Sequence, residues 1–251
     1  MAHLEKNFPE GLEFLQKLDE SIYSNCIQQT LSFIKNSPLL SAQVEGIGTL
    51  LSCLSRLSEC YYGCLNGNEH TKEYLLGKAC NSISSSWILL KNGHYDSCFS
   101  VIRETSEITN LFMLFSQDPK QYSDWKSSNE KTIRNKFNPA SVRKALEEEG
   151  IAIPVNKEIY SNLSKRFVHT SPDTRPELHN NMDRPVASGT YQESGIENTL
   201  RFMAYLISQL ALTSTLLLKP DYQVSEYIHN VAIKLKEITT NKTYPDSRQK
   251  I

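Results

Sequence analysis

The sequence lacks the patterns that mark β-rich chains, familiar catalytic loops and strongly charged binding surfaces. No stretch alternates apolar and polar residues as a half-buried strand does, and no segment is repeated along the chain. It contains no phosphate-binding glycine loop, no nucleophile elbow and no HExxH pair. The 27 lysines and arginines nearly balance the 28 aspartates and glutamates, so the net charge of −1 gives no overall sign of binding to DNA or an acidic membrane.

Signals for secretion and membrane insertion are also missing. The opening stretch, MAHLEKNFPEGLEF, has no apolar h-region, so we expect no secretory signal peptide. The most apolar run, residues 202–218, is short for a membrane span and is interrupted by serine, threonine and glutamine. These features predict a buried core helix at 202–218 and a cytoplasmic protein that does not bind membranes.

The six cysteines form no CxxC pair, and all fall in segments with a helical pattern. They are Cys26, Cys53, Cys60, Cys64, Cys80 and Cys98. This distribution is typical of small buried side chains in a reducing compartment rather than of a disulfide framework. Cys60 and Cys64 share a helical face, but two thiols without a nearby histidine are too few ligands for a metal site. We therefore predict neither a metal nor a cofactor.

Apolar residues recur at helical spacing along most of the chain. The predicted helices cover 10–36, 38–66, 71–91, 95–117, 139–149, 155–168, 194–219 and 222–240. Between them, the composition of residues 118–138 indicates short helical turns on the surface. The proline-rich stretch 170–193 shows no periodicity and is predicted to be a loop.

Length and composition fit one globular chain of ordinary polarity, with 251 residues, 39% hydrophobic and 22% charged. The fold class predicted is all-α, a single bundle domain of seven or eight helices over residues 1–251. Helices in 10–66 should pack on a core formed by 70–240, and residues 241–251 read as a polar tail. Gly46 and Gly48 should allow a close helix crossing.

A polar stripe runs along the otherwise apolar helix 95–117. At the helical angle of about 100° per residue, Glu107 lies ~40° and Asn110 ~20° from Arg103. Arg103 and Glu107 are also at i, i+4 spacing and can form an ion pair. Two readings stay open: a structural ion pair that locks the bundle, or one wall of a polar pocket in the bundle core.

A second polar group lies on the helix 155–168. Tyr160 and Ser164 share one face of it, and His169 follows near its end. His169 is the best candidate for a general base because its ordinary pKa lies near neutrality, although a histidine that only forms structural hydrogen bonds explains the same position.

The loop that follows His169 contains several charged residues whose spacing matches no compact motif. A metal-binding interpretation would use His169, Asp173, His179 and Asp183, and a phosphate-binding one Lys165, Arg166, Arg175 and Arg184. A polar loop contains such residues by default, so we interpret them as a solvated surface.

Several short motifs together resemble a group of uncharacterised bacterial helical proteins that are similar to the HEPN superfamily. The residues are Gly93, Tyr95, Arg103-x-x-x-Glu107, Asp118-Pro119, Trp125, Tyr160-x-x-Leu163-Ser164 and His169, within 70–220. The resemblance implies a four-helix core, a homodimer, an RNA or protein partner, and a role in bacterial defence or stress. It also implies a binding site in which Arg103 and Glu107 meet Tyr160, Ser164 and His169.

Many HEPN proteins cut RNA with an arginine that precedes a histidine by a longer interval than this chain offers. Arg166 and His169 are separated by only two residues, which puts the ribonuclease activity in doubt. Three functions stay open at this point: binding of a ligand or partner, metal-independent RNA cleavage by His169 with Arg166, and a scaffold without an active site. Whether the protein is an enzyme is therefore left open.

Overall fold

The computed structural model describes residues 16–65, 67, 69–164 and 189–240. Within these ranges it contains ten α-helices and no strand, which confirms the all-α class. A π-helical turn, η2 (Leu18–Tyr23), leads into the first of them. The helices are α2 (Ser24–Asn36), α3 (Pro38–Ser58), α4 (Thr71–Lys91), α5 (Tyr95–Gln117), α6 (Pro119–Ser127), α7 (Glu130–Lys136), α8 (Pro139–Glu148), α9 (Lys157–Leu163), α10 (Glu193–Leu218) and α11 (Tyr222–Thr240).

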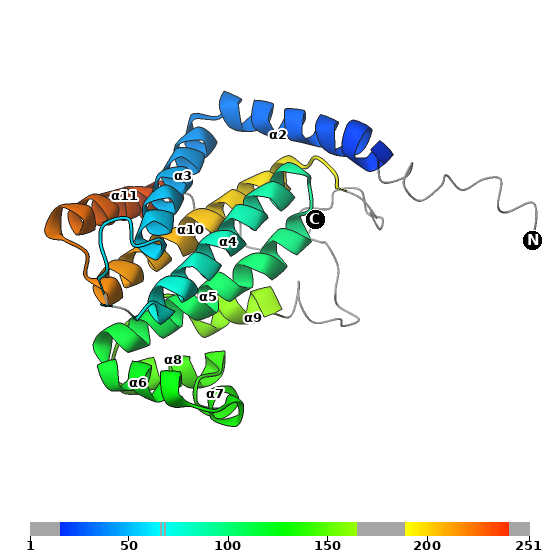
Figure 1. Ribbon diagram of the computed structural model, residues 1–251. Helices are drawn as coiled ribbons and strands as arrows, with labels where there is room; N and C mark the ends of the chain where they lie inside the picture. The colour runs from blue at the N-terminus through cyan, green and yellow to red at the C-terminus, as the bar shows by residue number, and fades with distance from the viewer. Residues whose placement is uncertain (1–15, 66, 68, 165–188, 241–251) are drawn as a thin grey trace, which may run out of the picture.

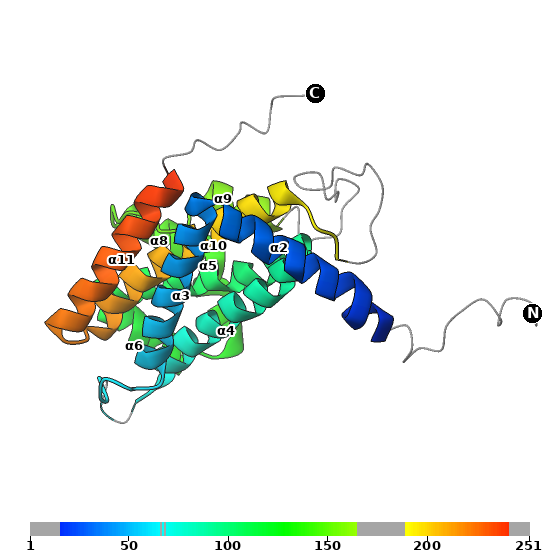
Figure 2. The same cartoon turned by 90° about the horizontal axis from the view of Figure 1, so that it is seen from above.

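Helix α10 occupies the centre of the bundle. It packs against α3, α4, α5 and α11, while α2 crosses one end of the bundle (Figures 1 and 2). Buried residues occur on all sides of α10. By length and composition alone, this helix could cross a membrane. However, 72% of its most apolar window is buried inside the structure, as expected for the core helix that the run 202–218 predicted.

Helix α5 is the second core helix and joins the bundle to a smaller layer. One side of it packs against α4 and α10 through buried residues that include Ile102, Phe112 and Phe115. Its other side contacts α8 and α9, and α6 to α8 lie beyond its C-terminal end (Figure 1). The expectation that 95–117 is a core helix is confirmed.

Local sequence explains where half of the described helices begin. The residue before each of five helices accepts a hydrogen bond from a backbone N–H of the first turn, which satisfies a donor that the helix itself leaves free. These capping residues are Ser37, Asp118, Asn129, Asn138 and Asn156. Three of them are followed directly by proline, which is well suited to the first helical position.

Close approaches of the backbone occur at two glycines. A Cβ on Gly46 would lie 2.9 Å from Leu235 of α11, which confirms the predicted close crossing there, whereas a Cβ on Gly48 would have no described neighbour within 4 Å. Gly93 ends the α4–α5 turn with φ of +76°, and a Cβ there would lie 2.5 Å from the backbone nitrogen of Thr190. The chain entering α10 therefore lies directly against the α4–α5 turn.

Some predicted boundaries were wrong. The helix expected to reach residue 66 ends at Ser58, so Cys60 and Cys64 lie in the connection to α4 rather than on a helix. Helix α9 begins at Lys157 rather than at residue 155, and residues 165–168 of the predicted helix lie outside the described residues. The helix count exceeds seven or eight because residues 118–138, which were not counted as helices, form two short ones, α6 and α7. Most of the predicted loop 170–193 lies outside the described residues, and α10 begins at Glu193.

Candidate functional site

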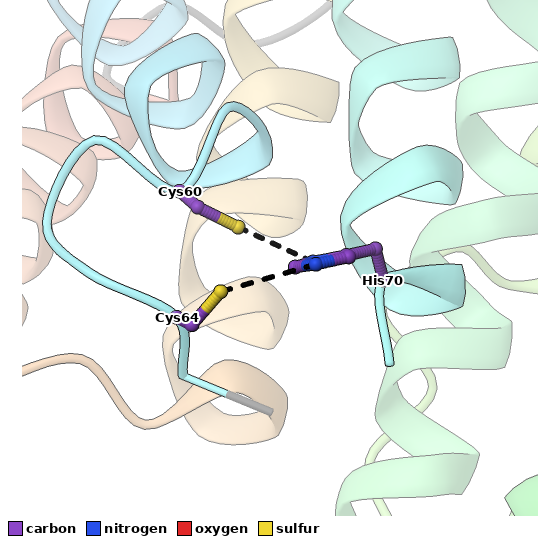
Figure 3. A group of neighbouring side chains, drawn as sticks. All are labelled: Cys60, Cys64 and His70. Atoms are coloured by element: carbon purple, nitrogen blue, oxygen red, sulfur yellow. Dashed lines mark hydrogen bonds between the residues drawn. The ribbon is translucent and has the colours of Figure 1, made fainter. Parts of the chain in front are cut away.

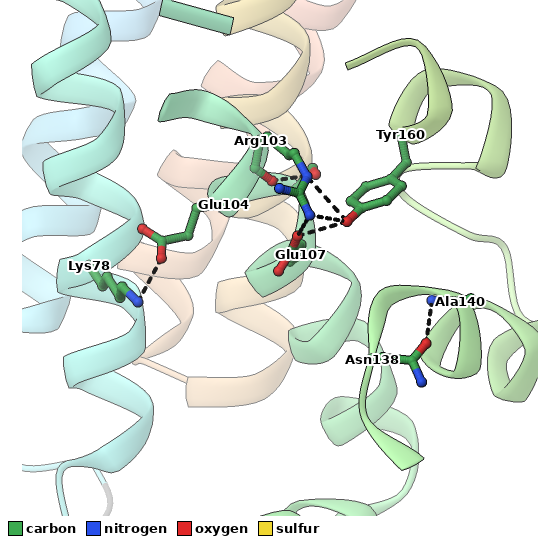
Figure 4. Close-up of polar contacts among 8 residues, drawn as sticks. Lys78, Arg103, Glu104, Glu107, Asn138, Ala140 and Tyr160 are labelled. Atoms are coloured by element: carbon green, nitrogen blue, oxygen red, sulfur yellow. Dashed lines mark hydrogen bonds and ion pairs between the residues drawn. The ribbon is translucent and has the colours of Figure 1, made fainter. Parts of the chain in front are cut away.

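The structure brings together Arg103, Glu107 and Tyr160, three of the residues that the sequence selected. Nη2 of Arg103 lies 2.8 Å from Oε1 of Glu107, one turn along α5. The Tyr160 hydroxyl, supplied by α9, accepts hydrogen bonds from Nε (3.2 Å) and Nη2 of Arg103. It donates in turn to Oε1 of Glu107 at 2.9 Å. Figure 4 shows that the three side chains point toward one another across the gap between α5 and α9.

The ion pair lies at the edge of the core rather than inside it. The side chains of Arg103 and Glu107 are 26% and 32% exposed, so the polar stripe expected in the bundle core is only partly buried. The physical reason is that α5 turns this stripe toward the small layer of α8 and α9, which covers it only in part. Solvent, or a bound molecule, therefore has access to the guanidinium.

Arg143 of α8 is a fourth member of the group that the sequence analysis missed. Its Cζ lies 4.6 Å from the centre of the Tyr160 ring, and Cζ of Arg103 lies 5.1 Å from it. The sequence does contain a sign that Arg143 is buried. It lies beside Val142 and Leu146, which form the apolar face of a short amphipathic helix. We call Arg103, Glu107, Tyr160 and Arg143 the Arg103 cluster.

Burial dominates the electrostatics of Arg143. Removal from water lowers the pKa of its guanidinium, and the nearby Tyr160, Glu147 and Glu107 oppose that effect. Its Nη1 is buried and forms no hydrogen bond in the described part of the chain. Two guanidinium groups thus share one tyrosine ring, and the carboxylates of Glu107 and Glu147 lie nearby.

Two further contacts hold α9 in place. Asn110, the third residue of the polar stripe, donates from Nδ2 to the carbonyl of Val155 (2.8 Å). Its Oδ1 accepts from the N–H of Val155 at 2.9 Å. The hydroxyl of Tyr205 on α10 donates to the carbonyl of Pro154. The segment before α9 is therefore tied to α5 and α10 by backbone groups, and this determines where Tyr160 lies.

Of the remaining predicted site residues, only Ser164 is described. It is buried, and its hydroxyl forms no hydrogen bond within the described ranges. His169 and Arg166 lie outside the described residues, as do the charged residues of the loop that follows them. The predicted general base and its arginine therefore stay predictions.

Glu104 points away from the Arg103 cluster. It forms an ion pair with Lys78 of α4 at 2.6 Å (Figure 4). It also accepts a hydrogen bond from Ser82 at 3.0 Å. This carboxylate therefore links α5 to α4. Glu107, one turn later, lies on the other side of α5 and contacts Arg103 and Tyr160.

A separate group gathers at the connection between α3 and α4. The thiol of Cys60 lies 3.4 Å from Nδ1 of His70, and the thiol of Cys64 lies 3.8 Å from its Nε2 (Figure 3). We call these three residues the Cys60 cluster. The sequence analysis noted the two thiols but treated them as helical residues without a histidine nearby. Because α3 ends at Ser58, the chain turns back and brings His70 to them.

A groove of about 620 Å³ lies between α3 and α11 and contains none of the predicted site residues. Cys53 and Arg56 line it from α3, and Tyr227 lines it from α11. Arg56 lies 4.9 Å from the ring centre of Tyr61. The groove therefore has a partly apolar wall and one cation that is already in contact with an aromatic ring.

Comparison of the chain with protein-family models, curated proteins and solved structures finds no match. What can be said of function therefore depends on the geometry of the two clusters.

Proposed function

We propose that this chain is a HEPN-like helical protein of the bacterial cytoplasm that binds a ligand or partner through an anionic group at the Arg103 cluster. The family, the compartment, the homodimer and the role in defence or stress depend on the sequence resemblance. The site itself depends on the contacts of Arg103.

The observation that carries the proposal is the way in which Arg103 is held. Its Nε and Nη2 are engaged by Tyr160 and Glu107, which fix the plane of the guanidinium. Nη1 forms no hydrogen bond within the described residues, and about a quarter of the side chain is exposed. A guanidinium fixed on one side and open on the other suits a carboxylate or phosphate, whose oxygens match its planar array of donors.

A second, buried guanidinium favours the same class of ligand. Arg143 is buried beside the Tyr160 ring, and its Nη1 forms no hydrogen bond within the described residues. A buried cation whose hydrogen bonds are incomplete is costly, and a bound anion nearby would offset part of that cost.

Binding is testable by thermal shift with inorganic phosphate, nucleotides, short RNA and dicarboxylates as probes. We expect at least one phosphate-bearing or carboxylate-bearing probe to raise the Tm of the wild-type protein. The Arg103→Ala variant should lose this shift, and Arg103→Lys should lose most of it because an ammonium lacks the planar fork. Arg134→Ala is the matched control, since Arg134 also forms an i, i+4 pair with a glutamate but is 76% exposed. A shift that survives in Arg103→Ala would contradict the proposal.

A scaffold without a binding function is the second candidate, and the closed set of contacts among Arg103, Glu107 and Tyr160 favours it. If the cluster only fixes the register of α9 on α5, replacing the pair with Arg103→Leu and Glu107→Leu together should be neutral or stabilising. A marked loss of stability in the double variant would reject this simple version. RNA cleavage by His169 stays a prediction, and His169→Ala with an RNA cleavage assay is its test.

A further inference from the structure

The Cys60 cluster is built by the local backbone at the end of α3. Cys60 adopts φ of +54°, in the left-handed region that non-glycine residues rarely occupy. The N–H of Cys60 donates to the carbonyl of Leu57 (3.2 Å), and the N–H of Tyr61 donates to that of Arg56 (2.9 Å). These two bonds define the helix-ending motif in which the left-handed position is usually glycine. A cysteine therefore stands where glycine would be less strained.

A tight turn then returns the chain to the same place. The N–H of Gly63 donates to the carbonyl of Cys60 at 2.9 Å, and Gly63 itself has φ of +98°. This turn places Cys64 beside Cys60, so that both thiols point toward the imidazole of His70 (Figure 3). The spacing of the two cysteines, with three residues between them, is within the range found at structural zinc sites.

His70 is available for this role because α4 does not use its side chain. It occupies the position before the first residue of α4, but its imidazole makes no capping hydrogen bond to the helix. The ligand atoms of Cys60, Cys64 and His70 all lie within 4.8 Å of one another. Tetrahedral zinc, with bonds of about 2.3 Å to sulfur and about 2 Å to nitrogen, needs ligand atoms roughly 3.5–3.8 Å apart. Small rotations of the side chains are therefore enough to close the site.

We infer that Cys60, Cys64 and His70 form a binding site for Zn²⁺ or another thiophilic divalent cation, which ties the end of α3 to the start of α4. Two thiolates and one imidazole select such ions over Mg²⁺ and Ca²⁺, which prefer oxygen ligands. Each bound thiol releases its proton when the metal–sulfur bond forms, and one imidazole nitrogen binds while the other stays free for a hydrogen bond.

The fourth coordination position is open to water or to a group from outside the described residues. Glu69 directly precedes His70, but its carboxylate is engaged elsewhere. It accepts hydrogen bonds from the N–H of Thr71 (2.8 Å) and from the hydroxyl of Tyr122. Burial opposes ionisation of Glu69, yet these hydrogen bonds outweigh it and lower the pKa of the carboxyl to about 2. Cys64 is exposed, so an ion has a path into the site from solvent.

The test uses the full chain, reduced with a phosphine and stripped with a chelator, and then titrated with Co²⁺ alone. We expect one equivalent to bind with thiolate-to-cobalt charge-transfer absorption and the visible bands of a tetrahedral ion, both lost when Zn²⁺ is added. Cys64→Ser, Cys60→Ser and His70→Asn should each weaken binding by about 100-fold or more. Cys53→Ser removes a half-buried thiol of α3 that is outside the cluster, and should bind as the wild type does.

Cys64→Ser is the decisive variant because an exposed side chain can be replaced without loss of the fold. A second readout is the Tm, which Zn²⁺ should raise in the wild type and in Cys53→Ser but not in Cys64→Ser. Reduced wild-type protein that shows no thiolate–cobalt absorption would overturn the inference. Equal affinity of wild type and Cys64→Ser would do the same.

Discussion

The Arg103 cluster and the Cys60 cluster each join elements that are separate in the sequence, but they differ in what completes them. In the Arg103 cluster, Tyr160 and Glu107 already hydrogen-bond to the guanidinium, and the chain holds α9 on α5 without any added group. In the Cys60 cluster, the close contacts are two thiol–imidazole approaches of 3.4 and 3.8 Å. Thiols are weak hydrogen-bonding groups, so these contacts contribute little by themselves.

This difference separates two ways of building a site. The first is ordered by the folded chain and is prepared for a ligand before it arrives. The second converges because of a strained turn, and a bound ion would supply most of its stabilisation. Substitutions in the Arg103 cluster should therefore change the free energy of unfolding equally with and without metal. For substitutions in the Cys60 cluster, the change should depend on whether metal is bound.

The largest effect is expected from Asn110→Ala, which removes the side chain that satisfies both backbone groups of Val155. Val155 is fully buried, so its N–H and C=O would lose their partners away from water. The free energy of unfolding in urea should fall by about 2–4 kcal/mol, with or without zinc. Gln117→Ala, at an exposed amide on the same helix, should change it by less than about 0.5 kcal/mol. Equal costs for the two variants would show that α9 is held by other contacts.

Tyr160→Phe tests the hydroxyl that links Arg103 to Glu107 while the aromatic ring stays in place against Arg143. We expect a loss of about 1–2 kcal/mol in the free energy of unfolding, because hydrogen bonds to charged groups are lost at a partly buried site. Tyr222→Phe is the control, since the hydroxyl of Tyr222 also donates to a glutamate but its side chain is 75% exposed. No difference between the two variants would argue against a preorganised guanidinium.

Cys60→Gly should have opposite effects in the two metal states, which sharpens the contrast between the clusters. In chelator, glycine relieves the left-handed strain at this position, and we expect a gain of about 0.5–1 kcal/mol. With Zn²⁺ the same variant should be less stable than the wild type because one ligand is missing. Cys60→Ser keeps the strain and also lacks the ligand, so it should gain nothing in chelator. A chelated Cys60→Gly protein no more stable than Cys60→Ser would contradict the strain argument.

The smallest effect is expected from Arg134→Ala. Arg134 and Glu130 repeat the i, i+4 pairing of the Arg103 cluster at 2.6 Å, but both side chains are more than three-quarters exposed and no tyrosine joins them. Urea unfolding should therefore change by less than about 0.5 kcal/mol. A cost as large as that of Tyr160→Phe would mean that the ion pair alone, rather than its tertiary partners, stabilises the Arg103 cluster.

Much of the helical layout was predictable because it depends on neighbours in the sequence. Polar capping residues, several of them followed by proline, mark where several helices begin. The i, i+4 and i, i+7 spacing put Arg103, Glu107 and Asn110 on one stripe. The boundary errors came where tertiary geometry overrode periodicity. The apolar pattern after Ser58 continues at helical spacing, yet the chain leaves the helix at Cys60. Cys60 is in the left-handed region there, and the intrinsic preferences of cysteine do not predict that conformation.

The all-α class and the residues on the polar side of α5 both follow from a period of 3.6 residues, so both could be predicted from the sequence. The partners that these residues contact could not be predicted in the same way. Arg143 and Tyr160 reach Arg103 from two other helices, and His70 reaches Cys60 across a turn, because packing depends on side-chain volumes and loop paths that local periodicity does not contain.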